Sequence, residues 1–524
     1  MNVAEILRSH ADAYPTEIAL VDVHRGRSRS MTYGELEQGA GRMAGLFRQS
    51  GLEAGDAVLV FHPMSAELYM VLAAIFRAGL TAVFMDPSAD RRLIEQCCSL
   101  LPPRGLVASS RAHLLRVVSP AIRRIPLRFS IGGRVPFAIP MERAADCRYD
   151  AEIERTDSEG PALATLTSGS TGEPKAAIRT HGFLLAQHRA LKESLAPSPG
   201  DVELSTLPVF VLANLASRVT SILADADLRR PAEVSPARVV EQIRAHSPNR
   251  AAASPAFFER IVEFCEERAV QLPSLQRVFT GGGPVSLALL DGLHRIAPRA
   301  EITAVYGSTE AEPIGTVDLQ DFDLEVRSAI HAGRGLLAGR PVSSIHVRVL
   351  EDRWGGPVGP FTTAAFDALC VPAGVAGEIV VSGDHVLPGY LNGRGEKENK
   401  FLVGKTRWHR TGDAGYFDDA GRIWLLGRCA ARVDDRRGVL YPLGVEQAAL
   451  RHPSVSQAAM VGHRGRRVLA VTLDDPTGRD AVDSLLESLS FAKVDSVRVL
   501  KRLPTDRRHN TKIDYPALRA LLEP

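Results

Sequence analysis

Cysteine is scarce in this sequence. The chain of 524 residues has six cysteines, and no two of them have the Cys-x-x-Cys spacing of a zinc or redox site. A disulfide framework needs a much denser set of cysteines. We therefore expect neither disulfides nor a structural zinc ion, and we expect a reducing, cytoplasmic location.

Long hydrophobic runs are also missing. The apolar run from Tyr69 to Phe76 is far shorter than the ~20 residues that a membrane-spanning helix needs. The first residues, Met1 to Ser9, include Glu5 and lack the basic-then-apolar pattern of a signal peptide. The sequence predicts no transmembrane segment and no export.

The sequence has no excess of charge of either sign. It has 63 Lys and Arg against 61 Asp and Glu, a net charge of +2, with 45% hydrophobic and 24% charged residues. A nucleic-acid partner usually requires a strongly basic surface. The composition is that of an ordinary globular protein, and a small-molecule substrate is the better expectation.

Much of the first 430 residues alternates between short apolar strands and helical patterns. Ala57–Phe61 predicts a strand, Ser65–Ala78 a helix that ends at Gly79, and Thr81–Phe84 the next strand. Further strands are predicted at Gly105–Ala108, Arg250–Ala253 and Arg277–Thr280, and further helices at Pro236–His246 and Ser286–Ile296. This alternation indicates parallel sheets covered by helices on both faces.

The pattern changes near Gly377. Gly377–Ser382 and Gly421–Leu426 predict antiparallel strands, and Gly355–Pro372 predicts an irregular loop. An α+β segment follows Arg428, with helices expected at Gly444–Arg451 and Asp480–Leu489 and a strand at Val468–Leu473. We therefore predict two domains, a large one over residues 1–428 and a small basic one over residues 429–524.

A glycine- and hydroxyl-rich loop follows the predicted strand Ala162–Leu166. Glycines let backbone N–H groups converge on an anion, hydroxyls add donors and Lys175 adds a positive charge, so the loop suits a polyphosphate. No Gly-Lys-Ser/Thr follows, so it is not the P-loop of kinases. A flexible Ser/Gly linker is the alternative. The residues expected to bind are Thr167, Ser168, Gly169, Ser170, Thr171, Gly172 and Lys175.

This loop resembles the phosphate loop of the acyl-adenylate-forming (ANL) superfamily, which includes acyl-CoA synthetases, non-ribosomal adenylation domains and luciferases. Other motifs follow in the order of that superfamily, over almost the whole chain. They are Met31–Leu36, Arg77–Gly79 with Asp86-Pro87, Tyr306–Glu310, Gly377-Glu378, Gly389–Asn392, Arg410–Asp413 and Gly427-Arg428.

The resemblance implies an α/β fold and an ATP-dependent, AMP-forming activation of a carboxylic acid. The large N-terminal lobe would contain parallel-rich sheets layered with helices and a small antiparallel, distorted barrel, and the small α+β C-terminal domain would be mobile. ATP and Mg²⁺ would be required. The product would be an acyl-adenylate, with pyrophosphate released.

The resemblance also assigns roles to individual residues. The 167–175 loop would hold the β- and γ-phosphates, Thr309 would reach the α-phosphate, and Glu310 would hold Mg²⁺ through its carboxylate. Tyr306 would stack on the adenine. The turn after the strand ending at Thr280 would line the adenine through Gly281, Gly282, Gly283 and Pro284, and Gly307 and Ser308 would also contact the nucleotide.

Two further motifs would complete the site. Asp413 would accept the ribose hydroxyls and Arg428 would bind ribose or phosphate, although Asp413 in isolation is also an ordinary turn residue. Lys512, which follows Arg507–His509, matches the C-terminal lysine that stabilises the developing charge during adenylation. The alternative for Lys512 is a solvated surface charge.

The hinge region departs from the superfamily pattern. Ala430 replaces the usual hinge acid or lysine, and Asp434–Gly444 replaces a lysine and glycine-rich turn that contributes to the pantetheine tunnel of acyl-CoA synthetases. These departures put CoA use in doubt. The stretches Tyr306–Ile314, Val439–Pro442 and Arg508–Ile513 resemble the β-lactone synthetases of olefin biosynthesis, which adenylate a β-hydroxy acid whose own hydroxyl then closes the ring.

The acyl group is expected to bind against Leu207–Ala216, with Phe210, Val211, Leu212 and Asn214 as candidate contacts. Its apolar character suits a fatty acid, although the same residues suit an ordinary core. CoA and an acyl carrier protein remain alternative acceptors, with pathway enzymes as further partners. Two other classes are a catalytically silent nucleotide- or acyl-binding protein and an ADP-releasing phosphotransferase.

Overall fold

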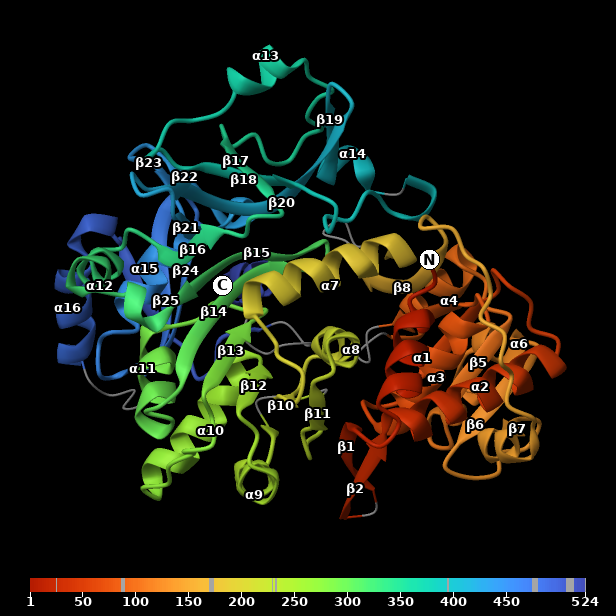
Figure 1. Cartoon of the computed structure of the whole chain (residues 1–524). Coiled ribbons are helices and arrows are strands. Elements are labelled where there is room, and N and C mark those ends of the chain that lie inside the picture. Colours follow the sequence, from red (N-terminus) through yellow and green to blue (C-terminus); the bar gives the residue numbers. More distant parts are fainter. Residues whose placement is uncertain are drawn as a thin grey trace. The chain divides into compact units, whose positions relative to one another are not determined.

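The computed structural model (Figure 1) describes residues 1–24, 26–85, 90–168, 174–228, 230, 233–393, 395–473, 479–505 and 513–523. The chain divides into two compact units, each of which is described by itself. Unit 1 is Met1–Arg229, Ser235–Ala252 and Gly389–Gly395; unit 2 is Arg230–Val234, Ala253–Pro388 and Glu396–Pro524. Every helix among the described residues is too short or too polar to span a bilayer.

Unit 1 contains a sheet with the strand order β7-β6-β5-β3-β4-β8-β9. All neighbours pair in parallel except β8 and β9, which form an antiparallel hairpin. The strands are β3 (Ala57–Phe61), β4 (Thr81–Met85), β5 (Gly105–Ser109), β6 (Leu127–Ile131), β7 (Ile139–Pro140), β8 (Pro161–Ser168) and β9 (Pro174–Thr180). The parallel sheet predicted from the sequence is confirmed.

Helices cover both faces of this sheet, as the sequence predicts. Val58 and Val60 of β3 share a core with α2 and α3, whereas Leu59 shares a core with α4 and α6. Successive residues of a strand point to opposite faces, so a strand buried on both faces is apolar throughout. The covering helices are α1 (Ala4–Ala13), α2 (Tyr33–Gln49), α3 (Ala66–Arg77), α4 (Arg91–Leu100), α5 (Leu115–Val118) and α6 (Pro120–Arg124).

The limits of α3 follow from the residues at its ends. The Ser65 side chain accepts a hydrogen bond from the Leu68 N–H at 3.3 Å, which caps the helix. The chain turns at Gly79 with φ +68°, where a Cβ atom would lie 2.5 Å from Cγ of Glu154. Only glycine fits that position, so the predicted helix and its end are confirmed.

A second group of strands in unit 1 has the order β12-β10-β11-β1-β2. Its members are β1 (Ile18–His24), β2 (Arg27–Thr32), β10 (Val202–Ser205), β11 (Thr220–Leu223) and β12 (Arg250–Ala253), and the helices α7 (His181–Leu195), α8 (Pro208–Ser217) and α9 (Pro236–His246) connect them. The predicted bounds of α9 and β12 agree with the structure.

Unit 2 changes from parallel to antiparallel pairing along its sheet. Strands β13 (Arg277–Gly281) and β14 (Glu301–Ser308) are parallel and are followed by an antiparallel series. The series contains β15 (Ala311–Asp318), β16 (Leu336–Pro341), β21 (Ile423–Arg428), β20 (Thr406–Phe417), β18 (Gly377–Ser382) and β17 (His346–Leu350), with β19 (Lys400–Val403) paired to β20. The helices are α10 (Pro255–Glu267), α11 (Leu287–Ile296), α12 (Leu324–His331), α13 (Thr363–Asp367) and α14 (Glu396–Asn399).

One local prediction needs refinement. The segment Gly355–Pro372, predicted to be an irregular loop, includes the short helix α13. Thr362 caps it by accepting a hydrogen bond from the Ala365 N–H at 3.3 Å. Phe366 of this helix is buried against Phe401 and Trp408, so tertiary packing stabilises a turn too short to be read from periodicity.

The C-terminal residues form the predicted α+β arrangement. The strands are β22 (Val433–Asp435), β23 (Gly438–Leu440), β24 (Val455–His463), β25 (Arg466–Leu473) and β26 (Ser496–Val499), and the helices are α15 (Pro442–Ala449), α16 (Arg479–Ser488) and α17 (Tyr515–Leu521). These elements belong to the compact unit 2. The domain boundary at residue 428 therefore remains a prediction.

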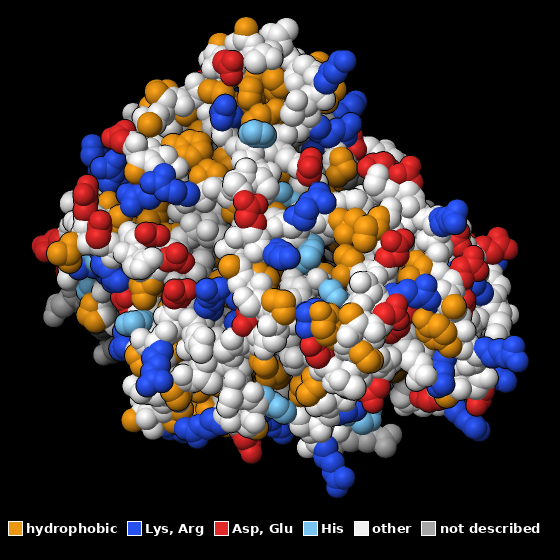
Figure 2. All heavy atoms as spheres, viewed as in Figure 1, with side chains coloured by type: hydrophobic (Ala, Val, Ile, Leu, Met, Phe, Trp, Pro, Cys, Tyr) orange, Lys and Arg blue, Asp and Glu red, His pale blue; other side chains and the backbone are white. Residues whose placement is uncertain are grey.

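The charges are well mixed over the molecular face drawn in Figure 2. Acidic and basic side chains lie among hydrophobic and uncharged ones over that face. This mixing agrees with the net charge of +2.

Candidate active site

The glycine turn after β13 is imposed by the close approach of β14. A Cβ atom on Gly281 would lie 2.4 Å from the carbonyl oxygen of Val305, and Gly282 has φ +84°. Any side chain at the first position would push the two strands apart. The turn Gly281–Pro284 thus presents backbone at the carboxyl end of β13, beside the end of β14, where the chemistry of parallel sheets is commonly located.

Tyr306 at the end of β14 is fixed by Asp413. Its phenol donates a hydrogen bond of 2.9 Å to Oδ2 of Asp413 on β20. Burial, followed by the Asp413 carboxylate, raises the pKa of Tyr306 well above its usual value of 10. The phenol therefore remains protonated and keeps the carboxylate oriented.

Arg428 contacts the other oxygen of the same carboxylate. Asp413 and Arg428 lie opposite each other on β20 and β21, and the guanidinium is 3.1 Å from Oδ1 of Asp413. Arg428 also donates to the carbonyl of Thr411 at 3.0 Å. Asp413 raises the pKa of Arg428. The structure therefore brings Tyr306, Asp413 and Arg428 together, and the oxygens of Asp413 have lone pairs left to accept two hydroxyls.

Thr309 and Glu310 form the turn between β14 and β15. The carbonyl of Glu310 accepts a hydrogen bond of 2.6 Å from the Leu387 N–H, and the Glu310 N–H donates to Oγ of Ser308 at 3.3 Å. The described residues contain no group of three or more His, Cys, Asp or Glu side chains arranged for a metal. A single carboxylate fits Mg²⁺, which is usually held by one or two carboxylates together with substrate phosphates and water.

Two buried basic side chains lie near Glu310, and sequence reasoning missed both. Nζ of Lys400 donates to the carbonyl of Leu387; burial lowers the pKa of Lys400 to about 7, while Glu310 opposes that shift. His409 lies opposite Lys400 across β19 and β20, and burial followed by the Lys400 charge lowers its pKa to about 3. A lysine in a short strand gives no sequence signal of burial, because only the pairing with β20 encloses it.

Glu378 and Arg410, which belong to the motifs noted above, form a buried ion pair instead of facing a ligand. Both side chains are 2% exposed, and the guanidinium donates to both carboxylate oxygens at 2.6–3.0 Å. Arg410 also lies over the ring of Trp354, 5.0 Å from its centroid. Gly412 has φ +70°, and a Cβ there would lie 2.9 Å from the same ring. These contacts hold β20 in the register that places Asp413.

The predicted phosphate loop joins β8 to β9 in unit 1. Thr167 and Lys175 lie opposite each other in this hairpin. The Lys175 side chain is buried, with Nζ 5.5 Å from the centroid of the Tyr390 ring, and a Cβ on Gly395 would lie 2.2 Å from its Cε. Gly169, Ser170, Thr171 and Gly172 lie outside the described residues, so their roles remain predictions.

Lys512 and Arg507–His509 also lie outside the described residues, as does Asp86-Pro87. The chain on either side of Lys512 is described: Thr505 pairs with Ile513, and the Tyr515 phenol donates to Oε1 of Glu446 at 2.7 Å. These contacts anchor both ends of the short segment that contains Lys512. The catalytic role of that lysine remains a prediction.

The segment predicted to contact the acyl group is the helix α8. Phe210 and Val211 are buried, and Asn214 donates to Glu203 and Ser221 at 2.8 and 3.1 Å. Leu212 instead lines a largely apolar, partly open cavity of about 100 Å³, together with residues of α1, α3 and α7. A typical ligand pocket measures roughly 300–1,000 Å³, so the cavity has room for part of a long chain only.

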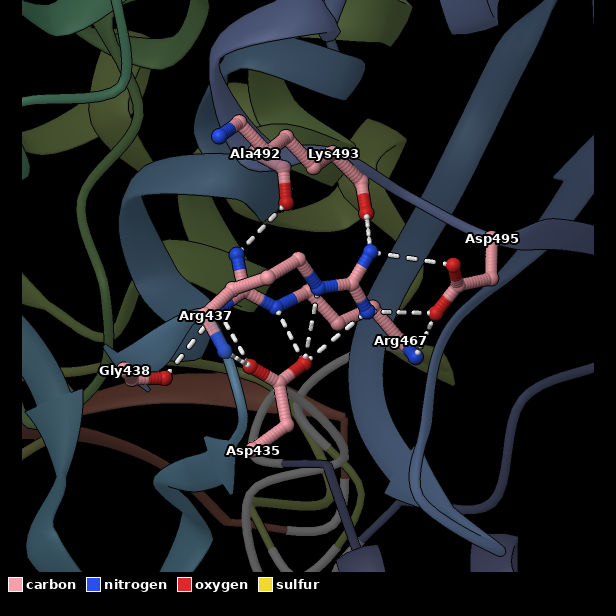
Figure 3. Close-up of polar contacts among 7 residues, drawn as sticks. All are labelled: Asp435, Arg437, Gly438, Arg467, Ala492, Lys493 and Asp495. Carbon is pink, nitrogen blue, oxygen red and sulfur yellow. Dashed lines mark hydrogen bonds and ion pairs between the residues drawn. The ribbon is translucent and has the colours of Figure 1, made fainter.

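An ion-pair cluster closes the β22–β23 hairpin, where the sequence departs from the superfamily (Figure 3). The Asp435 carboxylate accepts from Arg467 at 2.8 and 2.9 Å and from Arg437 at 2.9 and 3.2 Å. Arg437 also donates to Asp495 at 2.6 and 3.0 Å. Arg467 lowers the pKa of Asp435, and Arg437 contributes. The hairpin is therefore fastened to β25 and to the residues before β26.

Curated relatives align with nearly the whole chain. The olefin beta-lactone synthetase of Stenotrophomonas maltophilia is 29% identical over 98% of this chain and 96% of its own length, and that of Xanthomonas campestris is 28% identical over 92% and 89%. The 2-succinylbenzoate–CoA ligase of Bacillus velezensis is 26% identical over 87% and 84%.

Solved structures share the fold. The amide bond synthetase of Marinactinospora thermotolerans superposes with a TM-score of 0.81 at 20% identity, covering 99% of each chain. The O-succinylbenzoate coenzyme A synthetase of Bacillus subtilis, solved with ATP and magnesium ion, gives 0.78 at 21% identity, covering 98% of this chain and 99% of the other. The family described as AMP-binding enzyme matches residues 7–391. The chain therefore belongs to the AMP-binding enzymes of the ANL superfamily, the adenylate-forming ligases, and its reaction is the ATP-dependent formation of an acyl-adenylate.

Proposed function

We propose that this protein adenylates a long-chain β-hydroxy fatty acid and then closes it to a β-lactone, with release of AMP. The observation that carries the proposal is the β22–β23 hairpin, where Asp434–Gly444 replaces the glycine-rich turn of acyl-CoA synthetases and where Arg467 of β25 binds Asp435 of the hairpin. A hairpin held by several charged hydrogen bonds leaves no flexible turn to line a thiol tunnel. The alignments with olefin beta-lactone synthetases also support the substrate's own β-hydroxyl as the acceptor of the acyl group.

The residues of unit 2 would position the nucleotide. Asp413, oriented by Tyr306 and Arg428, would accept the ribose hydroxyls, and the Gly281–Pro284 turn would contact the adenine. Glu310 would hold Mg²⁺, which neutralises phosphate charge when bound. Lys175 and the hydroxyls of the 167–173 loop would bind the leaving pyrophosphate, and Lys512 would stabilise the charge that develops as the carboxylate attacks the α-phosphorus.

Ring closure needs no second substrate. The β-hydroxyl oxygen forms a bond to the acyl carbon, the bond from that carbon to the phosphate oxygen breaks, AMP leaves with the electron pair, and the hydroxyl proton passes to solvent. An internal nucleophile has a high effective concentration, so no thiol channel is required. The lobes 1–428 and 429–524 would carry the nucleotide site and Lys512, respectively.

The cavity next to α8 supports an apolar acyl group. Its lining is largely apolar and includes Leu7, Phe76, Leu184, Leu191 and Leu212. This favours an alkyl chain over an amino acid, whose ammonium group would need a charged partner. Transfer to CoA or to an acyl carrier protein is the second candidate, because 2-succinylbenzoate–CoA ligases also align with most of the chain.

The decisive experiment compares acyl acceptors. The enzyme is incubated with ATP, Mg²⁺ and a β-hydroxy fatty acid, with and without CoA, and AMP and lactone are quantified. We expect both products in equal amounts without CoA. The acid of equal length without the hydroxyl is the matched control, and it should support pyrophosphate exchange but little AMP release. Product formation only when CoA or a carrier is added would refute lactone closure.

A separate measurement tests catalysis itself. Carboxylate-dependent exchange of pyrophosphate into ATP should be lost in Glu310→Gln and retained in Glu325→Gln, a control on α12. If neither the wild type nor the control variant exchanges pyrophosphate, a catalytically silent binding protein is supported instead. Release of ADP in place of AMP would support a phosphotransferase.

A further inference from the structure

One segment of unit 1 contains positive charge of a single type. Between Gln96 and Met141 the chain has seven arginines and no lysine, aspartate or glutamate, although the whole chain is nearly neutral. The arginines are Arg104, Arg111, Arg116, Arg123, Arg124, Arg128 and Arg134. Such a run contrasts with the mixed charges of Figure 2 and requires a structural explanation.

Among the described residues, one of these arginines forms a close ion pair with a carboxylate and six do not. Arg104 lies 3.5 Å from a carboxylate oxygen of Asp56. In the described part of the chain, no carboxylate lies within 4.0 Å of the other six guanidinium groups. Burial, followed by the nearby Arg116 charge, lowers the pKa of Arg128. The neighbouring carboxylate of Glu95 already accepts from Ser119 and Ala121. Glu95 also interacts electrostatically with Arg124, so the positive charge of the segment is compensated only in part.

Contacts within unit 1 tie three of these arginines to elements at one edge of the sheet. Arg128 of β6 donates to the carbonyl of Arg123 in α6 at 2.6 Å, and Arg116 of α5 donates to the carbonyl of Pro136 at 3.0 Å. Figure 1 shows α6 and β7 at this edge of unit 1. We call the six arginines and the apolar residues described next the arginine face.

Exposed hydrophobic side chains lie among the arginines. The exposed fractions are 69% for Leu114, 75% for Val117, 54% for Val118 and 86% for Phe137. Phe137 has φ +60°, a left-handed backbone that a bulky residue adopts only at a cost. Because Arg116 bonds the backbone next to Phe137, the aromatic ring and the exposed turn of α5 belong to the same surface.

We propose that the arginine face docks unit 1 on an anionic phospholipid bilayer. Arginines bind lipid phosphates through charge and paired N–H groups, while leucine, valine and phenylalanine enter the headgroup–acyl boundary. A nucleic acid offers phosphates but no apolar layer to receive those side chains. A protein partner would need acidic side chains placed opposite six arginines, whereas an anionic bilayer offers phosphates over its whole surface. The inference does not depend on which acid the enzyme activates.

Vesicle co-sedimentation of the full chain tests the proposal. Phosphatidylcholine vesicles with and without 30% phosphatidylglycerol are compared at 100 and 500 mM NaCl. We expect at least tenfold tighter binding to the anionic vesicles at low salt. The double variant R123E/R124E should bind the anionic vesicles at least tenfold more weakly than the wild type. Each basic side chain near an anionic surface increases the affinity by a factor of about five. V117S/F137S should also bind severalfold more weakly, with its salt dependence retained.

The matched control is R244E/R299E, which changes the net charge equally at exposed arginines elsewhere in the chain. This control should bind like the wild type, and all variants should keep wild-type circular dichroism and pyrophosphate exchange. The proposal is overturned if the wild type does not bind anionic vesicles more tightly than neutral ones, or if the control loses as much binding as R123E/R124E. It is also overturned if the two arginine-face variants change self-association or protein binding but not vesicle binding.

Discussion

Replacing Glu446 by glutamine removes one buried ionisable group and keeps its shape. The Glu446 side chain is 6% exposed, and its Oε1 accepts from the Met460 N–H at 2.9 Å and the Tyr515 phenol at 2.7 Å. These bonds join α15, β24 and α17. Burial raises the pKa of Glu446 from 4.5 to about 7, and the two hydrogen bonds only partly oppose that shift.

The sign of the pH dependence follows from this raised pKa. Below pH 4.5 the carboxyl is protonated in both the folded and the unfolded chain. Between pH 4.5 and 7 the unfolded chain ionises while the folded chain keeps its proton, so the free energy of unfolding falls as pH rises. The free energy of unfolding falls by about 3 kcal/mol in total, because the pKa differs by about 2.5 between the two states and each pKa unit corresponds to about 1.36 kcal/mol. Above pH 7 the loss is constant.

Glu446→Gln should therefore become more stable than the wild type as pH rises. Glutamine accepts the same hydrogen bonds and cannot ionise, so the difference between the two proteins should grow by about 2–3 kcal/mol from pH 5 to pH 8. Urea unfolding is followed by tryptophan fluorescence, because Trp354, Trp408 and Trp424 all lie in unit 2 with Glu446. The pH-independent cost of the amide cancels in this comparison.

Glu487→Gln on α16 provides the control. Its side chain is exposed, and a surface substitution of this kind should change the free energy of unfolding by less than about 0.5 kcal/mol at either pH. Parallel stability curves for the wild type and Glu446→Gln would refute the argument from burial. A growing difference of the opposite sign would show that the ionised carboxylate is the favoured buried form.

Three further predictions concern the site and its support. Tyr306→Phe removes the hydrogen bond that orients Asp413 and should raise the KM for ATP about tenfold, with a smaller change in kcat. The reason is that a hydrogen bond to a charged group contributes about 1.5–3 kcal/mol. A tenfold lower kcat with an unchanged KM would contradict this role. Glu378→Gln leaves the buried Arg410 charge unpaired and should lower the free energy of unfolding by about 3–5 kcal/mol in urea titrations, whereas a loss under 1 kcal/mol would contradict the assignment. Lys512→Ala should slow pyrophosphate exchange at least a hundredfold while ATP affinity, measured by calorimetry, stays within about twofold; equal losses in both would contradict a role in the transition state.

Local patterns in the sequence were sufficient for much of the fold. The apolar runs at Ala57–Phe61 and Arg250–Ala253 are strands because a strand buried on both faces must be apolar throughout, and helix ends at Ser65 and Gly79 follow from capping and from a left-handed turn. The resemblance to the ANL superfamily also identified Tyr306 and Asp413, 107 residues apart, which the structure joins by a hydrogen bond.

The tertiary structure decided what those motifs and the remaining polar residues do. Glu378 and Arg410 belong to superfamily motifs, and strand pairing buries them against each other. The pairing of β19 with β20 encloses Lys400 beside His409. The arginine face became visible only in the structure, which shows that Arg116 and Arg128 donate to backbone carbonyls and not to carboxylates. The physical reason is that sequence fixes residue type and local geometry, whereas burial and charge pairing depend on segments far apart in the chain.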